Sequence, residues 1–364
     1  MSVFGLMHGI HGIHGIHGIH GIHGIHGIQA GSGGPASDAG TTSGLQSSTQ
    51  AIVHAAGFDP VDAAKTHDLA PNAAANLRRW APDVRSILLR GNFARQLGCS
   101  FDAPSARVSV TWRETTIWHA TRPNNRTLAA QAELVRMYGD QRADRSAEIL
   151  SQLGPFDAYF GIILGLNSAR NPKTFELLEV VQTLAGAATM MPKHLFACRR
   201  PDEIDARILP LIPTPGHGSF PSGHATQAFA MAEVLAALIR ANPRHYPDCE
   251  QRTRLLYRQA HRIAVNRTVA GVHFPIDSVA GAMFGLQIGR AVIGMMSGRT
   301  ALRTATLLDP NTAIHADFFY SDFELLFINK PGIQTTPTAT DPLFAWLWAE
   351  CMAEFGGMRQ VTGS

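Results

Sequence analysis

Residues 172–297 contain four long helical patterns, separated by short segments rich in proline, glycine, histidine and basic residues. The patterns cover residues 172–199, 225–240, 248–264 and 278–297. Their apolar residues recur at helical spacing, which predicts helices that bury one face against each other. An apolar content of 45% and a charged content of only 16% suit a well-buried, helix-rich chain. The sequence therefore predicts a well-buried protein that is mainly α-helical.

The first fifty residues have a different composition. From His8 to Ile28 the triplet His-Gly-Ile repeats seven times, a period that matches neither a strand nor an α-helix. Residues 29–50 are rich in Gly, Ser, Thr and Ala, which is typical of a linker. We therefore predict that residues 1–50 are a disordered repeat and linker. Binding of Zn, Cu or Ni by the repeated histidines is the open alternative.

Three further regions are predicted after this tail. Residues 51–165 form a helical supporting region, in which the alternating apolar residues of 106–118 predict a small β hairpin. Residues 166–300 form the helical bundle that carries the polar clusters described below. Residues 301–364 form a C-terminal extension that packs on the bundle.

The bulk properties restrict the class of protein. A net charge of +3 over 364 residues does not indicate a nucleic-acid partner. No secretory signal is apparent, and residues 278–297 are the one segment that resembles a membrane span. We interpret this segment as a core helix and expect a soluble, cytoplasmic protein without an integral membrane span, its homo-oligomeric state left open. We predict free buried thiols for the four widely spaced cysteines, Cys99, Cys198, Cys249 and Cys351.

The first polar cluster is Lys193-x6-Arg200-Pro201. A separation of seven residues is about two helical turns, so the spacing predicts that both basic side chains project from one side of a helix. Pro201 is predicted to stop that helix. Taken alone, such a pair is typical of solvated surface charge.

The second cluster is Pro221-Ser222-Gly223-His224, directly before the helical pattern of residues 225–240. Ser222 is a favoured residue type for the N-cap of that helix, which places Gly223 and His224 in its first turn. Helix N-termini present free N–H groups and a positive dipole end, and a glycine allows an oxyanion to approach the backbone closely. The cluster therefore indicates an anion site, with an ordinary serine cap as the alternative.

The third cluster is Asn266-Arg267-x5-His273-x3-Asp277. Pro275 is tolerated at the first position of a helix, so Asp277 falls in the first turn, where the helix dipole favours an acid. We expect Asp277 also to hydrogen-bond His273 and to fix the tautomer and orientation of its ring.

Together and in this order, the three clusters resemble one superfamily, which joins type 2 phosphatidic acid phosphatases, bacterial class A acid phosphatases and vanadium-dependent haloperoxidases. Its shared pattern is K-x6-R-P, P-S-G-H and S-R-x5-H-x3-D. Asn266 departs from this pattern, because the superfamily usually has serine there. Asparagine still donates a hydrogen bond, so we expect the site to be retained. The resemblance covers residues 193–277.

The resemblance implies a fold and a set of roles. The fold is a mainly α helical bundle of the acid phosphatase/vanadium haloperoxidase type. Phosphate or vanadate oxygens would be bound by Lys193, Arg200, Ser222, the Gly223 N–H and Arg267. His273 would be the axial ligand of vanadium or the nucleophile toward phosphorus. His224 would act as acid and base on the opposite side, and Asp277 would orient His273.

Two chemistries share such a pocket. The reading we favour at this point is a vanadium haloperoxidase-like enzyme, which holds vanadate as its cofactor. It would use hydrogen peroxide to oxidise a halide, bromide more than chloride, to hypohalous acid. His217 supports it, because a second histidine occupies the corresponding place, seven residues before His224, in bromoperoxidases. The alternative is a phosphatase that hydrolyses phosphomonoesters through a phosphohistidine and needs no cofactor. A non-enzymatic anion- or metal-binding protein is the third hypothesis.

Overall fold

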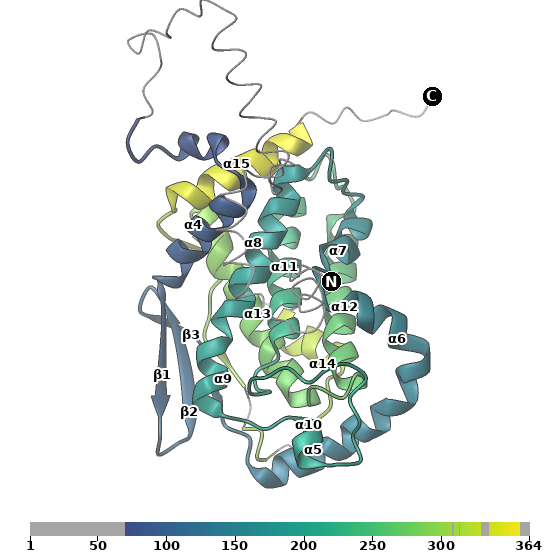
Figure 1. Cartoon of the computed structure of the whole chain (residues 1–364). Coiled ribbons are helices and arrows are strands. Elements are labelled where there is room, and N and C mark those ends of the chain that lie inside the picture. The colour runs from purple at the N-terminus through teal and green to yellow at the C-terminus, as the bar shows by residue number, and fades with distance from the viewer. Residues whose placement is uncertain (1–69, 308, 313, 329–334, 357–364) are drawn as a thin grey trace, which may run out of the picture. The chain divides into compact units, whose positions relative to one another are not determined.

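The structure is a computed structural model that describes residues 70–307, 309–312, 314–328 and 335–356. These residues are mostly helical, with one small sheet and a separate two-stranded ladder (Figure 1). The predicted mainly α architecture is confirmed. The predicted disordered repeat and linker of residues 1–50 lie outside the described residues.

The described chain falls into two units that meet between Leu88 and Leu89. The smaller one holds the short 3-10 helix η2 (Ala74–Arg79) and the start of α4 (Pro82–Ala94). Within it, Arg85 donates a hydrogen bond to the carbonyl of Leu77 at 3.0 Å. The larger unit holds everything that concerns the functional site.

The helices of the larger unit run in chain order as follows: α5 (Asn125–Tyr138), η3 (Gly139–Gln141), α6 (Arg142–Ser151), α7 (Asp157–Leu164), α8 (Pro172–Ala188), α9 (Met190–Phe196), α10 (Pro201–Ile204), α11 (Gly223–Arg240), α12 (Cys249–Val269), α13 (Pro275–Ser297), α14 (Tyr320–Phe323), the π-helical turn η4 (Glu324–Ile328) and α15 (Pro342–Gly356). Its strands are β1 (Leu97–Asp102), β2 (Arg107–Trp112), β3 (Thr115–Thr121), β4 (Arg299–Thr300), β5 (Ala305–Thr306) and β6 (Thr336–Pro337).

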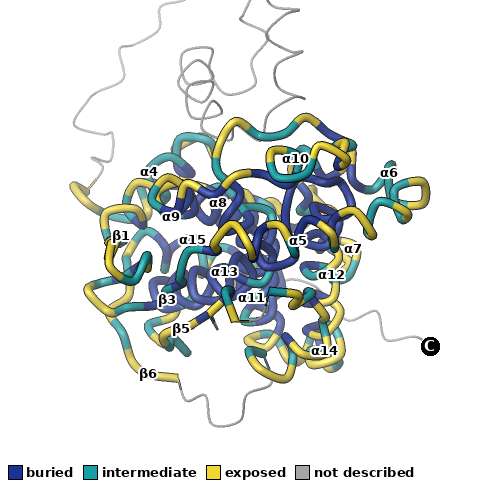
Figure 2. Tube along the Cα trace, turned by 90° about the horizontal axis from the view of Figure 1, so that it is seen from below, coloured by how far each residue is buried: buried dark blue, intermediate teal, exposed yellow. Residues whose placement is uncertain are grey.

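The core lies between α8, α11, α12 and α13. α11 packs most extensively on α13, and then on α12 and α8. Figure 2 shows α8, α11 and α13 as buried tubes inside a ring of partly exposed elements. Nearly every residue of α13 is buried. The four helical patterns of the sequence therefore correspond to the elements of the bundle.

Glycines at every fourth position of α13 allow α11 and α13 to approach each other closely. A Cβ atom on Gly281 would lie 2.4 Å from the carbonyl oxygen of Ser222, and one on Gly285 would lie 2.4 Å from that of Thr226. Both distances are far below van der Waals contact, so only glycine fits. The close approach allows Ser222 N to donate to the backbone carbonyl of Asp277 at 2.9 Å. The starts of α11 and α13 are thereby joined.

The break between α8 and α9 differs from the prediction. The sequence pattern of residues 172–199 predicts one helix, but α8 ends at Ala188 and α9 begins at Met190. Pro192 lies inside the first turn of α9, where its missing N–H removes no helical hydrogen bond. The helix ends instead at Ala197, which has a positive φ of 47°.

Pro201 starts α10 rather than stopping a helix, which is a second correction. Lys193 therefore lies on α9, and Arg200 is the N-cap residue of α10. The two side chains belong to different elements and do not project from one helix face.

The β structure is larger than the predicted hairpin of residues 106–118. β1, β2 and β3 form an antiparallel meander, and β5 adds to β3 in parallel, which gives the order β1-β2-β3-β5. β1 is exposed along most of its length, so it lacks the apolar alternation that marks a half-buried strand. β5 is a long-range partner that no local pattern can indicate.

The C-terminal helix α15 packs on α13 and α8. The carboxylate of Glu354 accepts hydrogen bonds from the backbone N–H and the hydroxyl of Thr174, at 3.0 and 2.7 Å. It therefore caps the start of α8 from a distant part of the chain. Phe318 is buried, whereas Phe319 is 57% exposed.

The four cysteines are free, as predicted. Cys198 and Cys351 are buried, but Cys99 is exposed on β1 and Cys249 is only half-buried, so the expectation of buried thiols is wrong for these two residues.

The close contacts at the glycines of α13 let us predict how one added methyl group changes the free energy of unfolding. Gly285→Ala should lower the free energy of unfolding by about 1–3 kcal/mol or more, because the new Cβ meets backbone of α11. Gly91→Ala is the matched control, since a Cβ at that helical position meets nothing within 4 Å. That variant should gain up to about 1 kcal/mol. Urea titration measures both, and equal midpoints for the two variants would contradict the packing described here.

Candidate active site

Lys193 is buried at the end of α9, with 2% of its surface exposed. Its Nζ donates to the carbonyl oxygens of Gly218 and Ser219, at 3.0 and 2.9 Å. Burial, and secondarily the Arg200 guanidinium, hold the pKa of Lys193 well below its usual value. Its hydrogen-bond acceptors are neutral carbonyls, so an anion can still gain from contact with it.

Arg200 connects three parts of the site. Its Nε donates to the carbonyl of His217 at 3.0 Å, and its Nη1 donates to the carbonyl of Val272 at 2.7 Å. The same Nη1 lies 3.1 Å from Nε2 of His273. Burial lowers the pKa of Arg200 to about 10, which Asp277 partly offsets. The guanidinium is therefore held beside the imidazole that the sequence analysis assigned as ligand or nucleophile.

Arg267 is the third basic residue of the sequence motifs, and it is buried in the last turn of α12. Its Nη2 donates to the carbonyl of Ile149 at 3.2 Å and to Oε1 of Gln152 at 2.9 Å. Its Nε and Nη1 are buried and have no hydrogen-bond partner among the described residues. Burial lowers its pKa to about 10. Buried N–H groups without partners are costly, so this side chain indicates a site for an anionic ligand.

His273 and Asp277 form the predicted pair. Nδ1 of His273 lies 2.9 Å from Oδ2 of Asp277, which also accepts the backbone N–H of Phe274 at 3.0 Å. A carboxylate only accepts, so Nδ1 carries the proton and Nε2 presents its lone pair. Burial, followed by the charges of Arg200 and Lys193, holds the pKa of His273 well below its usual value. Burial raises the pKa of Asp277 to about 7.

The loop before His273 owes its course to Gly271. This residue has a φ of 84°, and a Cβ there would lie 2.7 Å from Nη2 of Arg142. Nε of Arg142 donates to the carbonyl of Val269 at 2.9 Å, so α6 holds the end of α12. The turn delivers His273 to the start of α13.

Ser222, Gly223 and His224 lie at the start of α11, as predicted. The hydroxyl of Ser222 accepts the backbone N–H of Ala225 at 3.4 Å and so caps the helix. A Cβ on Gly223 would meet only the hydroxyl of Thr189, at 3.8 Å, so the space next to its Cα is open. Nε2 of His224 donates to the backbone carbonyl of Gln152 at 3.0 Å.

His217 lies in the exposed loop between α10 and α11. Its Nδ1 is 3.1 Å from Nη2 of Arg200. Partial burial, and then the charge of Lys193, lower the pKa of His217 to about 4. Arg200 also lies beside His273, so the guanidinium connects the two imidazoles.

Gln152 is a site residue that the sequence analysis missed. It ends α6, is fully buried, and contacts Arg267, Asn266 and His224. Phe156, four residues later, stacks on His224 with ring centroids 5.8 Å apart. No local signal could have found either residue, because the glutamate and arginine residues of α6 suggested only a solvated helix.

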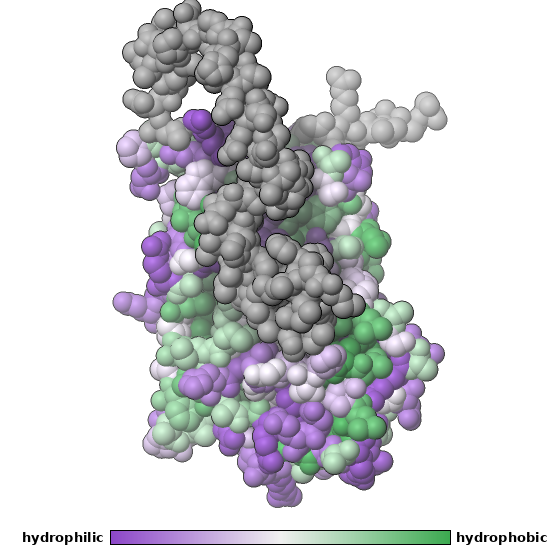
Figure 3. All heavy atoms as spheres, in the orientation of Figure 1, coloured by the Kyte–Doolittle hydropathy of each residue, from purple (hydrophilic) through white to green (hydrophobic). Residues whose placement is uncertain are grey.

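Figure 3 shows the molecule in the orientation of Figure 1. Hydrophilic residues gather at the end of the visible face where Figure 1 shows α5 and α10.

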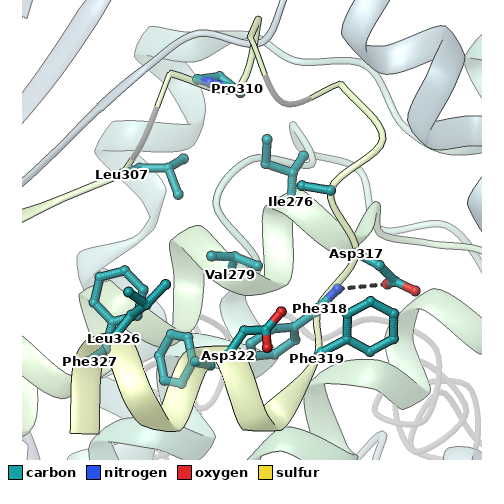
Figure 4. Close-up of a pocket in the computed structure, with 12 residues that line it drawn as sticks. Ile276, Val279, Leu307, Pro310, Asp317, Phe318, Phe319, Asp322, Leu326 and Phe327 are labelled. Atoms are coloured by element: carbon teal, nitrogen blue, oxygen red, sulfur yellow. Dashed lines mark hydrogen bonds between the residues drawn. The ribbon is translucent and has the colours of Figure 1, made fainter.

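A separate cavity of about 190 Å³ lies against the first turns of α13, beside Ile276 and Val279 (Figure 4). Its charged lining residues among those described are the acids Asp317 and Asp322. An anion is disfavoured there, so the oxyanion chemistry belongs to the basic cluster.

The helical bundle thus surrounds a cluster of buried basic residues and imidazoles. The family model of the PAP2 superfamily matches residues 177–301, which contain all three motifs. This region of the chain is therefore a PAP2 superfamily region, and the resemblance seen in the sequence is confirmed. No curated protein matches the chain.

One solved structure that resembles the chain is titled as the crystal structure of the first transmembrane PAP2 type phosphatidylglycerolphosphate phosphatase from Bacillus subtilis. It is 22% identical and covers 46% of this chain and 94% of its own, with a TM-score of 0.28. A likeness this weak says nothing about the chemistry of the present chain.

The expectation of a soluble, cytoplasmic protein is contradicted. Among the described residues, α13 is long and apolar enough to cross a membrane. In the structure 89% of the apolar window of α13 is buried. A core helix and a membrane span have the same composition, which is why the sequence did not separate them.

Because Arg267 has unpartnered N–H groups, we expect a bound anion to stabilise the folded chain. At an orthophosphate concentration of 100 times its Kd, the wild-type chain should gain about 2.7 kcal/mol of unfolding free energy. Arg267→Met should lose most of this gain. Without phosphate it should unfold no more easily than the wild type, because a desolvated charge has been removed.

Arg258→Met is the matched control for this experiment. Arg258 lies on the same helix, but it is exposed and lies over the ring of Tyr320, 5.6 Å from the ring centroid. This variant should retain the phosphate effect in a thermal melt. An equal loss in both variants would contradict the assignment of Arg267.

Proposed function

We propose that this chain hydrolyses phosphomonoesters through a phosphohistidine formed on His273. The observation that carries the proposal is the distance of 3.1 Å between Nη1 of Arg200 and Nε2 of His273. An oxyanion bound to this arginine has its central atom next to the lone pair of that nitrogen. Nearby, Lys193 and the start of α11 supply further groups suited to phosphate oxygens.

The reaction would proceed in two steps. Nε2 of His273 attacks phosphorus, and the bond from phosphorus to the ester oxygen breaks while His224 gives that oxygen a proton. Asp277 stabilises the positive charge that forms on the ring of His273. A water molecule then gives a proton to His224 and attacks the phosphohistidine, which releases orthophosphate and restores the neutral ring.

We favour phosphatase activity over the haloperoxidase activity that the sequence favoured. The preference for a haloperoxidase rested mainly on His217. Nδ1 of His217 lies within hydrogen-bond distance of Arg200, so orienting the guanidinium is a sufficient role for it in either chemistry. The family match is to a superfamily that includes phosphatases.

His273→Ala should abolish both hydrolysis and labelling of the protein. A short incubation with ³²P-labelled phenyl phosphate, quenched in base, should leave label on the wild-type chain that acid then releases. The matched control is His261→Ala, because His261 is a largely buried histidine of α12 that donates to the carbonyl of Phe318 at 2.8 Å, outside the site. Wild-type labelling of His273→Ala, or label that is stable to acid, would refute the phosphohistidine.

The pKa of Asp277 leads us to expect a specific pH dependence of the reaction. The pKa of His273 is depressed, so its ring stays neutral at and below neutral pH. The pKa of Asp277 is raised to about 7, so the carboxylate is lost as the pH falls through that value. The kcat/KM should therefore fall below pH about 7. Asp277→Asn should be slower at every pH and lack this acid limb, and an unchanged limb in that variant would assign it to another group.

Vanadium-dependent halide oxidation is the second candidate, kept because His217 supplies a further imidazole next to Arg200. Vanadate is a tetrahedral oxyanion like phosphate, so the unpartnered N–H groups of Arg267 and the lone pair of His273 suit it equally. His273 would hold it, and it would supply a Lewis acid that activates peroxide. The chain's own residues would bind its oxygens as they would bind those of phosphate.

A paired assay separates the two candidates. We expect the purified full chain to hydrolyse phenyl phosphate, and added vanadate to inhibit it as a phosphate mimic. The chain loaded with vanadate and given peroxide and bromide should leave a chromogenic acceptor unbrominated. Bromination that depends on vanadate, together with an absence of hydrolysis, would reverse the order of the two candidates.

A further inference from the structure

Gln152 lies at the end of α6, in a segment that the PAP2 match of residues 177–301 does not include. It is fully buried, and each of its polar groups meets a specific partner. Oε1 accepts from Arg267 at 2.9 Å and from Nδ2 of Asn266 at 3.1 Å, and the backbone carbonyl accepts from His224 at 3.0 Å. One residue thus contacts the arginine, the asparagine and the acid/base histidine.

We propose that Gln152 is a positioning residue of the active site. Its side-chain amide sets the orientation of Arg267, and its backbone carbonyl sets that of His224. The segment from the end of α6 to Phe156 therefore forms one wall of the anion site. This inference rests on the proposed function in assigning Arg267 to the oxyanion.

The contacts of Arg267 show how the positioning works. A long arginine side chain has many rotamers, and an anion site is effective only if its donors are already in place. Gln152 and the carbonyl of Ile149 both hold Nη2, while Nε and Nη1 keep their N–H groups unpartnered. The neutral amide fixes the guanidinium without cancelling its charge.

The orientation of the Gln152 amide is itself determined. Its Nε2 donates to Oε1 of Glu148 at 3.1 Å, and Glu148 in turn pairs with Arg262 of α12 at 2.6 Å. A flipped amide would point its N–H groups at Arg267 and its oxygen at Glu148. Both contacts are unfavourable, so Oε1 faces the guanidinium.

This arrangement also explains Asn266, which replaces the usual serine of the superfamily pattern. Nδ2 of Asn266 donates to Gln152, and its Oδ1 accepts from Nη1 of Arg145 at 3.1 Å. A serine hydroxyl is shorter and cannot place a donor and an acceptor on these two groups at once. Asn266 and Gln152 therefore act together, and both connect α12 to α6.

The experiment measures the Kd of orthophosphate by calorimetry on the full chain, with a thermal melt of each variant. Gln152→Met keeps the size and the backbone carbonyl but releases Arg267, and should raise the Kd about tenfold. Gln152→Glu keeps the shape but adds a carboxylate that pairs with Arg267, and should raise the Kd further. Gln287→Met is the matched control, because Gln287 is equally buried and accepts the backbone N–H of Arg303 at 3.2 Å, on the C-terminal half of α13.

The outcomes are distinct. The inference predicts a loss of affinity in both Gln152 variants and none in Gln287→Met. Wild-type affinity in Gln152→Met and Gln152→Glu overturns it, and so does an equal loss in Gln287→Met. If Gln152→Met does not fold, Asn266→Ser decides, since it removes one contact to Gln152 and should weaken phosphate binding a few-fold. Unchanged binding there overturns the inference too.

Phosphate binding also separates this inference from the proposed function. A wild-type chain that binds phosphate in a Gln152-dependent way, yet hydrolyses no monoester, refutes the function and supports the inference. If the wild-type chain hydrolyses monoesters and the Gln152 variants bind phosphate normally, the function is supported and the inference is refuted. A wild-type chain that binds no phosphate overturns the anion site and the inference with it.

Discussion

The arrangement of the site depends on the burial of three basic side chains that are solvated mainly by neutral groups. Lys193 and Arg200 donate to backbone carbonyls, and Arg267 donates to a carbonyl and an amide oxygen. Desolvation of such groups is costly, and the depressed pKa values of all three express that cost. Carbonyl dipoles reduce the cost without neutralising the charge, so the groups remain able to bind a dianion.

The bundle places the three buried basic side chains by bringing helix ends together. Gly281 and Gly285 allow α13 to contact the backbone of α11, and the start of α11 is thereby fixed beside Asp277. The basic residues come from the end of α9, the start of α10 and the end of α12. Removing the close contact between α11 and α13 would therefore disturb the site as well as the stability.

The parts of the site that could be predicted from the sequence are those set by local rules. Ser222 caps α11 and Asp277 binds His273 from the first turn of α13, because capping and i,i+4 spacing act within one element. The prediction that Lys193 and Arg200 project from one helix was wrong, because Ala197, a residue with positive φ, ends the helix between them. Gln152 was missed altogether. Its role comes from contacts more than 70 residues away in the chain, which no spacing within the motifs encodes.

The most direct test of this account is the position of a bound oxyanion. Crystals of the full chain grown with tungstate, a heavy mimic of phosphate, would locate the anion by its anomalous scattering. The account predicts a peak adjacent to Nε2 of His273, with oxygens in contact with Lys193, Arg200 and the free N–H groups of Arg267. A peak away from His273, or contacts that omit Arg267, would contradict it.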